Sequence, residues 1–343
     1  MENFAGADLH KKVTQLGLLR KGKPPSQFRF SNDPHTVEKV LSRLPSGTKI
    51  AVEATGTWWW FVEKVRELGH EVFLSHPKQT KAIASARLKS DKVDALMLAR
   101  LLKADLLPMV WIPGEKERYV RELLSHRGRL VRSRTAVINE LHAVYAKRNV
   151  EVVGKAWLKA YPVPYRVKEL SGYGPRIVKE NVELLRFVNE QIDGLDKELR
   201  KLAKEDPQAN RLMTLIGVGP ATAVAVSCWV GDINRFANAK KLTSYFGIAP
   251  RVRQSADKER HGHISKEGSR MVRWLLIQAA LSHTRVAKGP SRKHYLGVLN
   301  RQGKKIARVA AARKLLGVMY HIMKDEIDYE EFVRRGSSAQ RAR

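Results

Sequence analysis

The stretch NFAGADLHKKVTQLGLL, residues 3–19, decides the fold of the first part of the chain. It holds two apolar, β-favouring runs, Asn3–Asp8 and Lys12–Leu19. A third run, Gln27–Phe30, follows the turn-forming segment Gly22–Pro25. Three runs of this kind, separated by short polar segments, predict three strands at the start of the chain.

Helices and strands alternate in the next part of the sequence. A helix is expected from Pro34 to Leu44, with Asp33 or a neighbour as its cap. The runs KIAVE and EVFLS are typical of buried strands, and Val93, Leu96, Met97 and Leu101 have helical spacing. The expected elements are strands Lys49–Glu53 and Glu71–Ser75 and helices Trp58–Leu68, a segment through Ala82, and Asp91–Lys103. Three strands followed by this alternation is the element order of a ribonuclease-H-like α/β fold.

Two long helices with a different composition come next. Glu115–Asn149 has apolar residues three and four apart, and the part from Arg118 to Arg148 has eight Lys and Arg against two Glu. A second helix is expected over Arg176–Glu205, after the segment Tyr161–Pro175, which is rich in Pro, Gly and Tyr. The pair is typical of an antiparallel coiled-coil arm. Packing of both helices on their own domain is the alternative.

The net charge of the 343-residue chain is +30, with 64 Lys and Arg against 34 Asp and Glu. An apolar content of 43% excludes a disordered basic tail protein, and a single cysteine excludes a disulfide scaffold. No run approaches the roughly 18 apolar residues of a membrane span, and the N-terminus lacks a signal-peptide pattern. We therefore expect a soluble intracellular protein that binds a polyanion, with nucleic acid first among the candidates. A basic ribosomal or surface-adhering protein is the alternative.

The positive charge is concentrated in the last third of the chain. Gly268–Lys324 holds 13 Lys and Arg and no Asp or Glu, which favours contact with phosphates over a merely solvated face. Upstream, LIGVGPATA at residues 215–223 indicates helix, glycine turn and helix, as in helix-hairpin-helix elements that hold a phosphate backbone. Gly217 and Gly219 are the candidate contacts there, and an ordinary helical turn is the alternative. The expected domains are residues 1–110, the arm 111–205, a mainly α domain 206–330 and a tail 331–343.

Four acids in this basic chain are placed where they can act together. Asp8 and Glu53 end two predicted strands, and Asp91 and Asp94 lie three apart at the start of a helix, so their carboxylates share one face. Such a set matches the hard oxygen ligands that two Mg²⁺ ions need for chemistry at phosphorus. Each acid also has a simpler explanation, as a turn cap, an exposed strand end or a favourable charge at a helix N-terminus.

Three blocks carry a resemblance to a known family: GADLHKK, VEATGTWWW and KSDKVDALMLARLL. They resemble the N-terminal domain of the DEDD transposases of the insertion-sequence 110 family, which is similar to the Holliday junction resolvase RuvC. The resemblance implies that Asp8, Glu53, Asp91 and Asp94 hold Mg²⁺ or Mn²⁺.

A fourth block, TSYFGIAPRVRQSADKERHGHISKEGSRMVRWLLIQAA, resembles the C-terminal transposase domain of the same family. The resemblance implies that Ser255 is a nucleophile that attacks DNA and stays covalently attached to it. Ala256 departs from the glycine that is common in relatives at that position. Two other serines are candidates, with Ser265 expected to cap the following helix and Ser269 to lie within it.

Basic residues surround this serine. Arg251, Arg253, Lys258 and Arg260 are expected to hold the scissile phosphate, and Arg270, Arg273, Lys304 and Lys305 are expected to contact nucleic acid. His261 and His263 suggest zinc only weakly, because Cys228 is the single thiol and no partner is near it in sequence. The three tryptophans Trp58–Trp60 fit either base stacking or core packing.

The resemblance implies a recombinase that cuts and rejoins donor and target DNA, guided by a structured noncoding bridge RNA. It further implies a homo-oligomer, a dimer or tetramer, in the prokaryotic cytoplasm at the nucleoid. A RuvC-like nuclease that uses water as nucleophile is the first alternative. A non-catalytic nucleic-acid-binding protein on the same scaffold is the second.

Overall fold

The structure, a computed structural model, describes residues 2–83, 91–152, 166–255, 258–287 and 289–341. For residues 91–92, 252–255, 258–261 and 337–341 it describes the backbone only. The chain forms two compact units, Met1–Ile112 and Pro113–Arg343. No helix among the described residues is long and apolar enough to cross a membrane.

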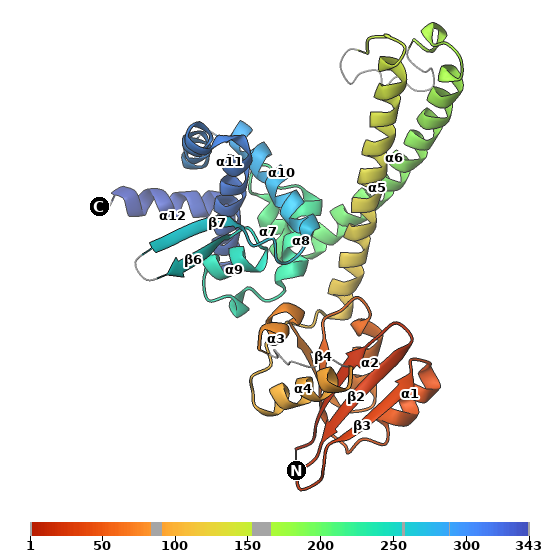
Figure 1. The fold of residues 1–343 in the computed structure, drawn as a ribbon. Helices are drawn as coiled ribbons and strands as arrows, with labels where there is room; N and C mark the ends of the chain where they lie inside the picture. The colour runs from red at the N-terminus through yellow and green to blue at the C-terminus, as the bar shows by residue number, and fades with distance from the viewer. Residues whose placement is uncertain (1, 84–90, 153–165, 256–257, 288, 342–343) are drawn as a thin grey trace. The chain divides into compact units, whose positions relative to one another are not determined.

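The first unit is built on a five-stranded mixed sheet with the order β3-β2-β1-β4-β5 (Figure 1). The first three strands are antiparallel neighbours, whereas β4 and β5 run parallel to β1. All five strands expected from the sequence are confirmed. Their bounds are β1 Phe4–Leu9, β2 Val13–Leu19, β3 Ser26–Ser31, β4 Lys49–Glu53 and β5 Glu71–Ser75.

Helices cover both faces of this sheet. One face buries Ala5, Ile50 and Leu74 beneath α1 and α2, whose Leu41 and Phe61 are fully buried. The other face packs Ala51 against helix α4. Helix α1 starts as expected, because the Asp33 carboxylate accepts a hydrogen bond from the Thr36 amide at 2.8 Å. The bounds are α1 Pro34–Leu41, α2 Trp58–Glu67, α3 Pro77–Ile83 and α4 Asp91–Lys103.

Helix α4 contacts the sheet at backbone distance. Gly6 of β1 and Gly17 of β2 are paired across the two strands. A Cβ atom on Gly6 would lie 2.1 Å from the carbonyl oxygen of Ala95, and one on Gly17 would lie 2.9 Å from the amide nitrogen of Leu96. Both positions therefore require glycine, because any side chain would push the helix off the strands.

The second unit begins with the two long helices α5, Glu115–Ala146, and α6, Gly174–Glu205, which pack side by side (Figure 1). Their outer halves share a small core that includes Leu141 and Val178. Their inner halves enter the main core of the unit through Leu124 and Leu199. Both interpretations of these helices are therefore partly right, since the pair is an arm at one end and packs on its own domain at the other.

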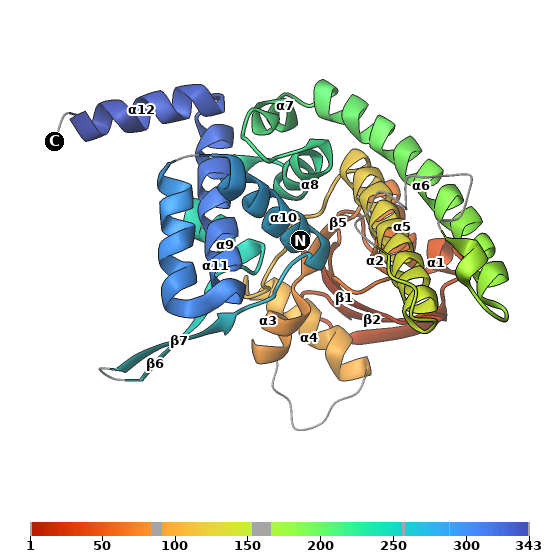
Figure 2. The same cartoon turned by 90° about the horizontal axis from the view of Figure 1, so that it is seen from above.

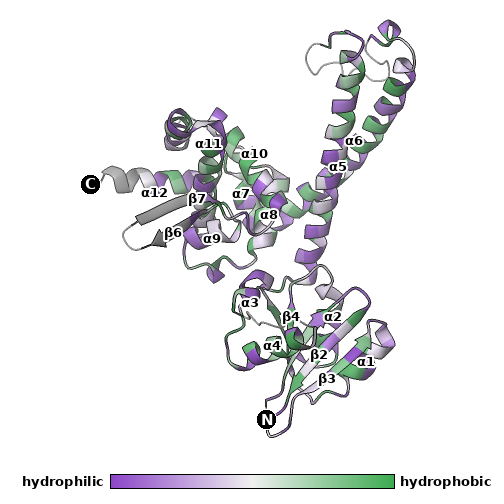
Figure 3. Ribbon diagram, viewed as in Figure 1, coloured by the Kyte–Doolittle hydropathy of each residue, from purple (hydrophilic) through white to green (hydrophobic). Residues whose placement is uncertain are grey.

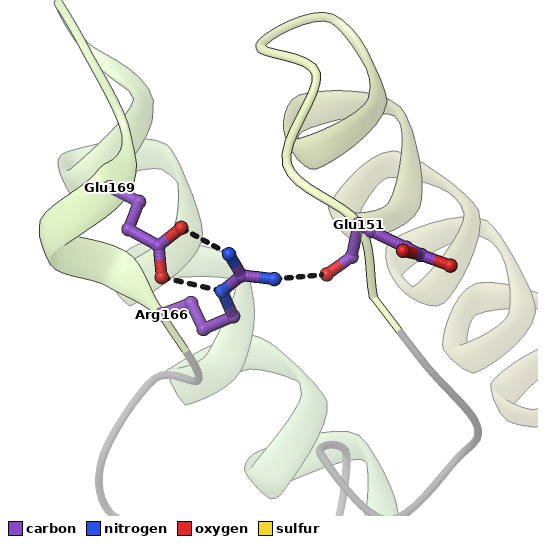
Figure 4. Close-up of polar contacts among 3 residues, drawn as sticks. All are labelled: Glu151, Arg166 and Glu169. Atoms are coloured by element: carbon purple, nitrogen blue, oxygen red, sulfur yellow. Dashed lines mark hydrogen bonds and ion pairs between the residues drawn. The ribbon is translucent and has the colours of Figure 1, made fainter.

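One guanidinium group joins the two chain segments at the outer end of the arm (Figure 4). Arg166 donates from Nη1 to the carbonyl oxygen of Glu151 at 3.0 Å, and its Nε and Nη2 bind both carboxylate oxygens of Glu169. Glu151 lies beyond the end of α5 and Glu169 lies in η2, Val167–Glu169, which precedes α6. The contact ties the chain leaving α5 to the chain entering α6.

A helical body completes the second unit, with α8 buried along most of its length. Figure 3 shows the hydrophobic residues of this body concentrated where the helices meet. Helix α11 contains a bend at Gly303, where φ is 76°. The elements are α7 Pro207–Met213, α8 Pro220–Val230, η3 Ile233–Arg235, α9 Ala239–Tyr245, β6 Pro250–Ser255, β7 Lys258–Ile264, α10 Arg270–Val286, α11 Pro290–Lys324 and α12 Tyr329–Arg341.

The antiparallel hairpin of β6 and β7 was not predicted from the sequence, which indicated a mainly α domain over residues 206–330. The hairpin projects from the helices of its unit in both views (Figure 1 and Figure 2). Its strands PRVRQS and KERHGHI carry few apolar residues, so they lack the alternation by which a half-buried strand is recognised.

We expect Gly6→Ala to lower the free energy of unfolding of the first unit by about 3 kcal/mol, because the added methyl group overlaps the backbone of α4. Denaturant unfolding followed by circular dichroism measures the change. Gly194→Ala is the control, since Gly194 lies in α6 with open space around its Cβ position. It is expected to stabilise the protein by about 0.5–1 kcal/mol. Wild-type stability of Gly6→Ala would contradict this account of the contact.

Candidate functional site

Asp8 and Glu53 lie at the carboxyl ends of two neighbouring parallel strands. The last printed pair between β1 and β4 joins Ala7 to Val52, so the two acids follow it directly in the same register. Neighbouring strands are about 4.8 Å apart. The Asp8 side chain is 18% exposed, and its Oδ2 lies 3.3 Å from Nε2 of His10. Two of the four predicted acids are thus brought to one edge of the sheet.

Asp94 belongs to the helix that covers this same face. Side chains alternate along a strand, so Asp8 points to the side of Gly6, and Glu53 points to the side of Ala51. That side is the one on which α4 packs, and Asp94 directly precedes Ala95, which touches Gly6. The fold therefore places these three acids on one face of the sheet.

The acidic side chains that the structure describes do not form a complete set of metal ligands. Within the described part of the chain, no three His, Cys, Asp or Glu side chains lie together as a metal-binding group. The side chain of Asp91 is outside the described residues, while its backbone begins α4. The sequence analysis is thus supported in the placement of Asp8, Glu53 and Asp94, and the joint coordination of a metal stays a prediction.

The three adjacent tryptophans divide between two roles. Trp58 and Trp60 pack against the core of the sheet. Trp59 lies along a surface hollow of about 250 Å³ at the start of α2. The hollow is lined by Gly56, Thr57, Trp59, Trp60 and Glu63. Core packing is therefore confirmed for two of the three, and base stacking stays open for Trp59.

Ser255 is the last residue of β6 and is paired with Lys258 of β7 across the hairpin. It therefore lies beside the tip of a two-stranded ribbon. Of the four basic residues expected around it, Arg251 is exposed and donates from Nη2 to the carbonyl oxygen of Ser265 at 3.2 Å. The side chains of Ser255, Arg253, Lys258 and Arg260 are outside the described residues, as is Ala256.

The base of this hairpin is fixed to the helical body by Arg273. Its Nη1 donates to the carbonyl oxygens of Glu267 at 2.6 Å, Gly268 at 2.9 Å and Phe246 at 3.3 Å. Burial lowers the pKa of this guanidinium group, although not enough to remove its charge. Arg273 was expected to contact nucleic acid, and these bonds give it a structural role at the hairpin.

Two glycines allow the same loops to meet. Gly247 has a φ of +67°, and a Cβ there would lie 1.9 Å from the carbonyl oxygen of Glu267. Gly268 has a φ of +74°, and a Cβ there would lie 2.3 Å from the carbonyl oxygen of Tyr245. The segments GIAP, residues 247–250, and HISKEG, residues 263–268, are thus adjacent in space. This explains why glycine stands at positions 247 and 268.

The two other candidate serines do not have the roles expected for them. Ser269 is the N-cap of α10, where its Oγ accepts a hydrogen bond from the Val272 amide at 3.3 Å. Ser265 lies before the helix, and its Oγ accepts from the Glu267 amide at 3.4 Å. The expectation was wrong because Lys266 and Gly268 both adopt positive φ, which is incompatible with a right-handed helix that starts at Ser265.

The glycine turn before α8 also has a structural explanation. A Cβ on Gly217 would lie 2.6 Å from the amide nitrogen of His283 in α10, and φ is +88°. His283 is buried, and its Nδ1 is 2.9 Å from the carbonyl oxygen of Ile216. Gly219, the N-cap of α8, has open space around it. Of the two glycines, only Gly219 stays a candidate for backbone contact with a phosphate.

The other predicted nucleic-acid contacts lie on α10 and α11. Arg270, Lys304 and Lys305 are exposed, the latter two just after the bend at Gly303. Cys228, in contrast, is buried in α8, and burial raises the pKa of its thiol to about 11. A protonated, buried thiol is a poor zinc ligand. The described residues therefore give the zinc hypothesis no support.

Two family models match this chain, one in its N-terminal part and one in its C-terminal part. Residues 5–147 match the model of the DEDD transposases of the IS110 family. Residues 209–296 match the model of the transposase IS116/IS110/IS902 family. The protein belongs to the IS110 family of transposases. As a member, it is an enzyme that acts on DNA in transposition and recombination.

Relatives of this transposase cover nearly its whole length. A protein of Pseudomonas aeruginosa named "Probable family 20 transposase" is 28% identical over 94% of each chain. The transposase for insertion sequence element IS1111A of Coxiella burnetii is 28% identical over 94% of this chain and 90% of its own. The pilin gene-inverting protein of Moraxella bovis is 26% identical over 82% of each chain.

The two matches divide the candidate residues of this transposase between them. The DEDD match contains the five-stranded sheet except Phe4, together with all of α4 and α5, and so includes all four acids. The second match runs from α7 into α11 and includes the hairpin with Ser255. The acids and the serine therefore belong to separately recognised parts of the family.

Proposed function

We propose that this transposase cuts and rejoins DNA by phosphoryl transfer, with a ribonuclease-H-like, RuvC-like first unit that binds divalent metal. The observation that supports the proposal is the register of β1 and β4, which puts Asp8 and Glu53 side by side on the face covered by α4. Carboxyl ends of parallel strands are the usual place for catalytic groups in sheets of this kind.

The residues at this edge suit Mg²⁺ or Mn²⁺. Asp8, Glu53, Asp91 and Asp94 offer only carboxylate oxygens, the hard ligands that both ions prefer. A bound ion would neutralise charge on the transferring phosphoryl group. The acids themselves repel one another, so a cation is the natural counter-charge that draws them together.

Ser255 is the proposed nucleophile. In the first step its Oγ forms a bond to phosphorus while the bond from phosphorus to a deoxyribose oxygen breaks, and the serine proton passes to solvent or a base. In the second step the hydroxyl of another strand attacks the phosphoserine, which releases Ser255 and joins the strands. The hairpin suits this role, because Arg273 holds its base while its tip projects from the body.

Replacing Asp8 by Asn is expected to reduce metal-dependent DNA cleavage by more than about 100-fold, because it removes a charged ligand and keeps the size of the side chain. Cleavage of labelled DNA in Mg²⁺ or Mn²⁺ measures the effect. Asp33→Asn is the matched control in the same unit, since Asn caps a helix as well as Asp does. Equal cleavage by wild type and Asp8→Asn would remove the metal site from the mechanism.

Ser255→Ala distinguishes the recombinase from the alternative nuclease. The variant is expected to form no covalent protein–DNA adduct on denaturing gels, whereas a nuclease that uses water would still cut DNA. Ser265→Ala is the control, because Ser265 lies at the other end of the same hairpin and is expected to leave the adduct intact. Loss of the adduct in Ser265→Ala alone would move the nucleophile to that residue.

We propose further that a structured guide RNA supplies sequence specificity, that donor and target DNA are the substrates, and that the protein acts as a homo-oligomer in the cytoplasm. The excess of +30 over the whole chain, to which exposed basic residues of α10, α11 and α5 contribute, supports binding to a large polyanion. Sequencing the nucleic acid that co-purifies with the protein is expected to return one discrete RNA. Recovery of bulk nucleic acid alone would reject RNA guidance.

A further inference from the structure

Two classes of buried hydroxyl group occur in the first unit. Thr14 and Thr48 have no exposed surface, and their Oγ1 atoms donate hydrogen bonds of 2.6 Å to Asn32 Oδ1 and to the carbonyl oxygen of Pro45. Ser75 has no exposed surface either, and Thr80 is 5% exposed. Their hydroxyl groups have no hydrogen-bond partner among the residues that the structure describes.

Ser75 is the neighbour of Glu53 across the sheet. The two residues are paired in register between β5 and β4, and the Ala54 amide donates to the Ser75 carbonyl at 3.0 Å. Phe73 packs on the side of α4, so by alternation Ser75 points to that side too. Asp8, Glu53 and Ser75 therefore form a row across three adjacent strands on one face.

Other unsatisfied groups lie at the same edge. Thr55 follows Glu53 by two residues, and Thr80 lies in α3, which begins directly after β5. Across the described chain, the buried hydroxyl groups without a partner are those of Thr55, Ser75 and Thr80. The Nδ1 atom of His76 is also buried without a partner among these residues. Such groups are rare in proteins. Among the described residues, the hydroxyl groups of this kind all lie at the carboxyl end of β4 or β5 or shortly after it, at the end of the sheet that holds the acids, whereas other unpartnered buried atoms, such as Nε of Arg308, are nitrogens elsewhere in the chain.

We propose that Ser75, with Thr55 and Thr80, forms the outer wall of the divalent-cation site, where these hydroxyl groups hydrogen-bond the water ligands of the ion. The inference rests on the proposed metal function of Asp8 and Glu53. Magnesium and manganese ions keep several water ligands at phosphoryl-transfer sites, and those waters need fixed acceptors. A hydroxyl group both accepts and donates, so it can orient such a water without adding charge.

The alternative is that these hydroxyl groups serve only packing. The two explanations predict opposite results for stability and for metal affinity. An outer-wall hydroxyl contributes nothing to the metal-free fold, because no group among the described residues bonds to it, and contributes to metal affinity. A structural hydroxyl contributes to the metal-free fold alone.

The test measures both quantities on the full-length protein with Ser75→Ala. Mn²⁺ affinity is followed by electron paramagnetic resonance of the free ion, and metal-free stability by the melting temperature. We expect the Mn²⁺ dissociation constant to rise about tenfold, as for other residues that support metal ligands. The metal-free melting temperature is expected to stay unchanged.

Thr48→Val is the matched control at the opposite end of β4. It removes a hydroxyl group that is equally buried but hydrogen-bonded, so it is expected to lower the metal-free melting temperature and leave Mn²⁺ affinity unchanged. Thr80→Val and Thr80→Ser are a second pair of variants, which tests the role of the hydroxyl groups in Mn²⁺ binding if Ser75→Ala fails to fold. Weaker Mn²⁺ binding is expected for Thr80→Val and wild-type binding for Thr80→Ser.

Asp8→Asn separates failure of this inference from failure of the metal site. If Asp8→Asn weakens Mn²⁺ binding but Ser75→Ala and Thr80→Val do not, the metal site stands and the hydroxyl wall is overturned. If Asp8→Asn binds Mn²⁺ as wild type does, or if wild type binds none, the metal function itself fails. A fall in metal-free stability of Ser75→Ala that matches Thr48→Val, with unchanged affinity, assigns the hydroxyl to packing.

Discussion

The contact between helix α4 and strands β1 and β2 is the constraint on which the first unit depends. A helix normally stands off a sheet by the length of the intervening side chains, but Gly6 and Gly17 remove those side chains at one paired position. The backbone of Ala95 then rests on the strand, and the residue before it, Asp94, is held over the face to which Asp8 points. The same approach lets α4 pack on this face through Leu98, Leu101 and Leu102. The pairing of Gly6 with Gly17 thereby determines how closely Asp94 of α4 can approach Asp8 of β1.

Much of this arrangement could be predicted from the sequence, because strands and helices of the first unit bury regular apolar faces. The strand bounds, the Asp33 cap and the positions of Asp8 and Glu53 at strand ends all follow from local pattern. What could not be predicted depends on contacts between distant segments. Polar strands β6 and β7 carry no core pattern, and the start of α10 at Ser269 rather than at Ser265 follows two residues with positive φ. The role of Arg273 was missed because a guanidinium group that binds backbone carbonyls and one that binds phosphate have the same sequence signature.

The second unit combines a stable body with two projecting elements, each secured by an arginine. Arg273 binds three carbonyl groups at the base of the hairpin, and Arg166 closes the tip of the arm (Figure 4). Lower on the arm, Arg127 pairs with Asp196 through two bonds of 2.5 and 3.1 Å, which link α5 to α6. Planar guanidinium groups suit these positions because they bind several oxygens at fixed angles. Basic residues therefore shape the elements of this family member as well as charging their surfaces.

The buried thiol of Cys228 has a practical consequence. It is the single cysteine of the chain, and a pKa of about 11 keeps it protonated and unreactive at neutral pH. The native sequence is thus already a background without an exposed thiol for surface labelling. One cysteine introduced on the first unit and one on the hairpin would be the reactive thiols of the protein. A pair of spin labels or fluorophores attached there would report the separation of acids and serine in solution, with and without nucleic acid, and so measure directly how the two halves of the enzyme come together.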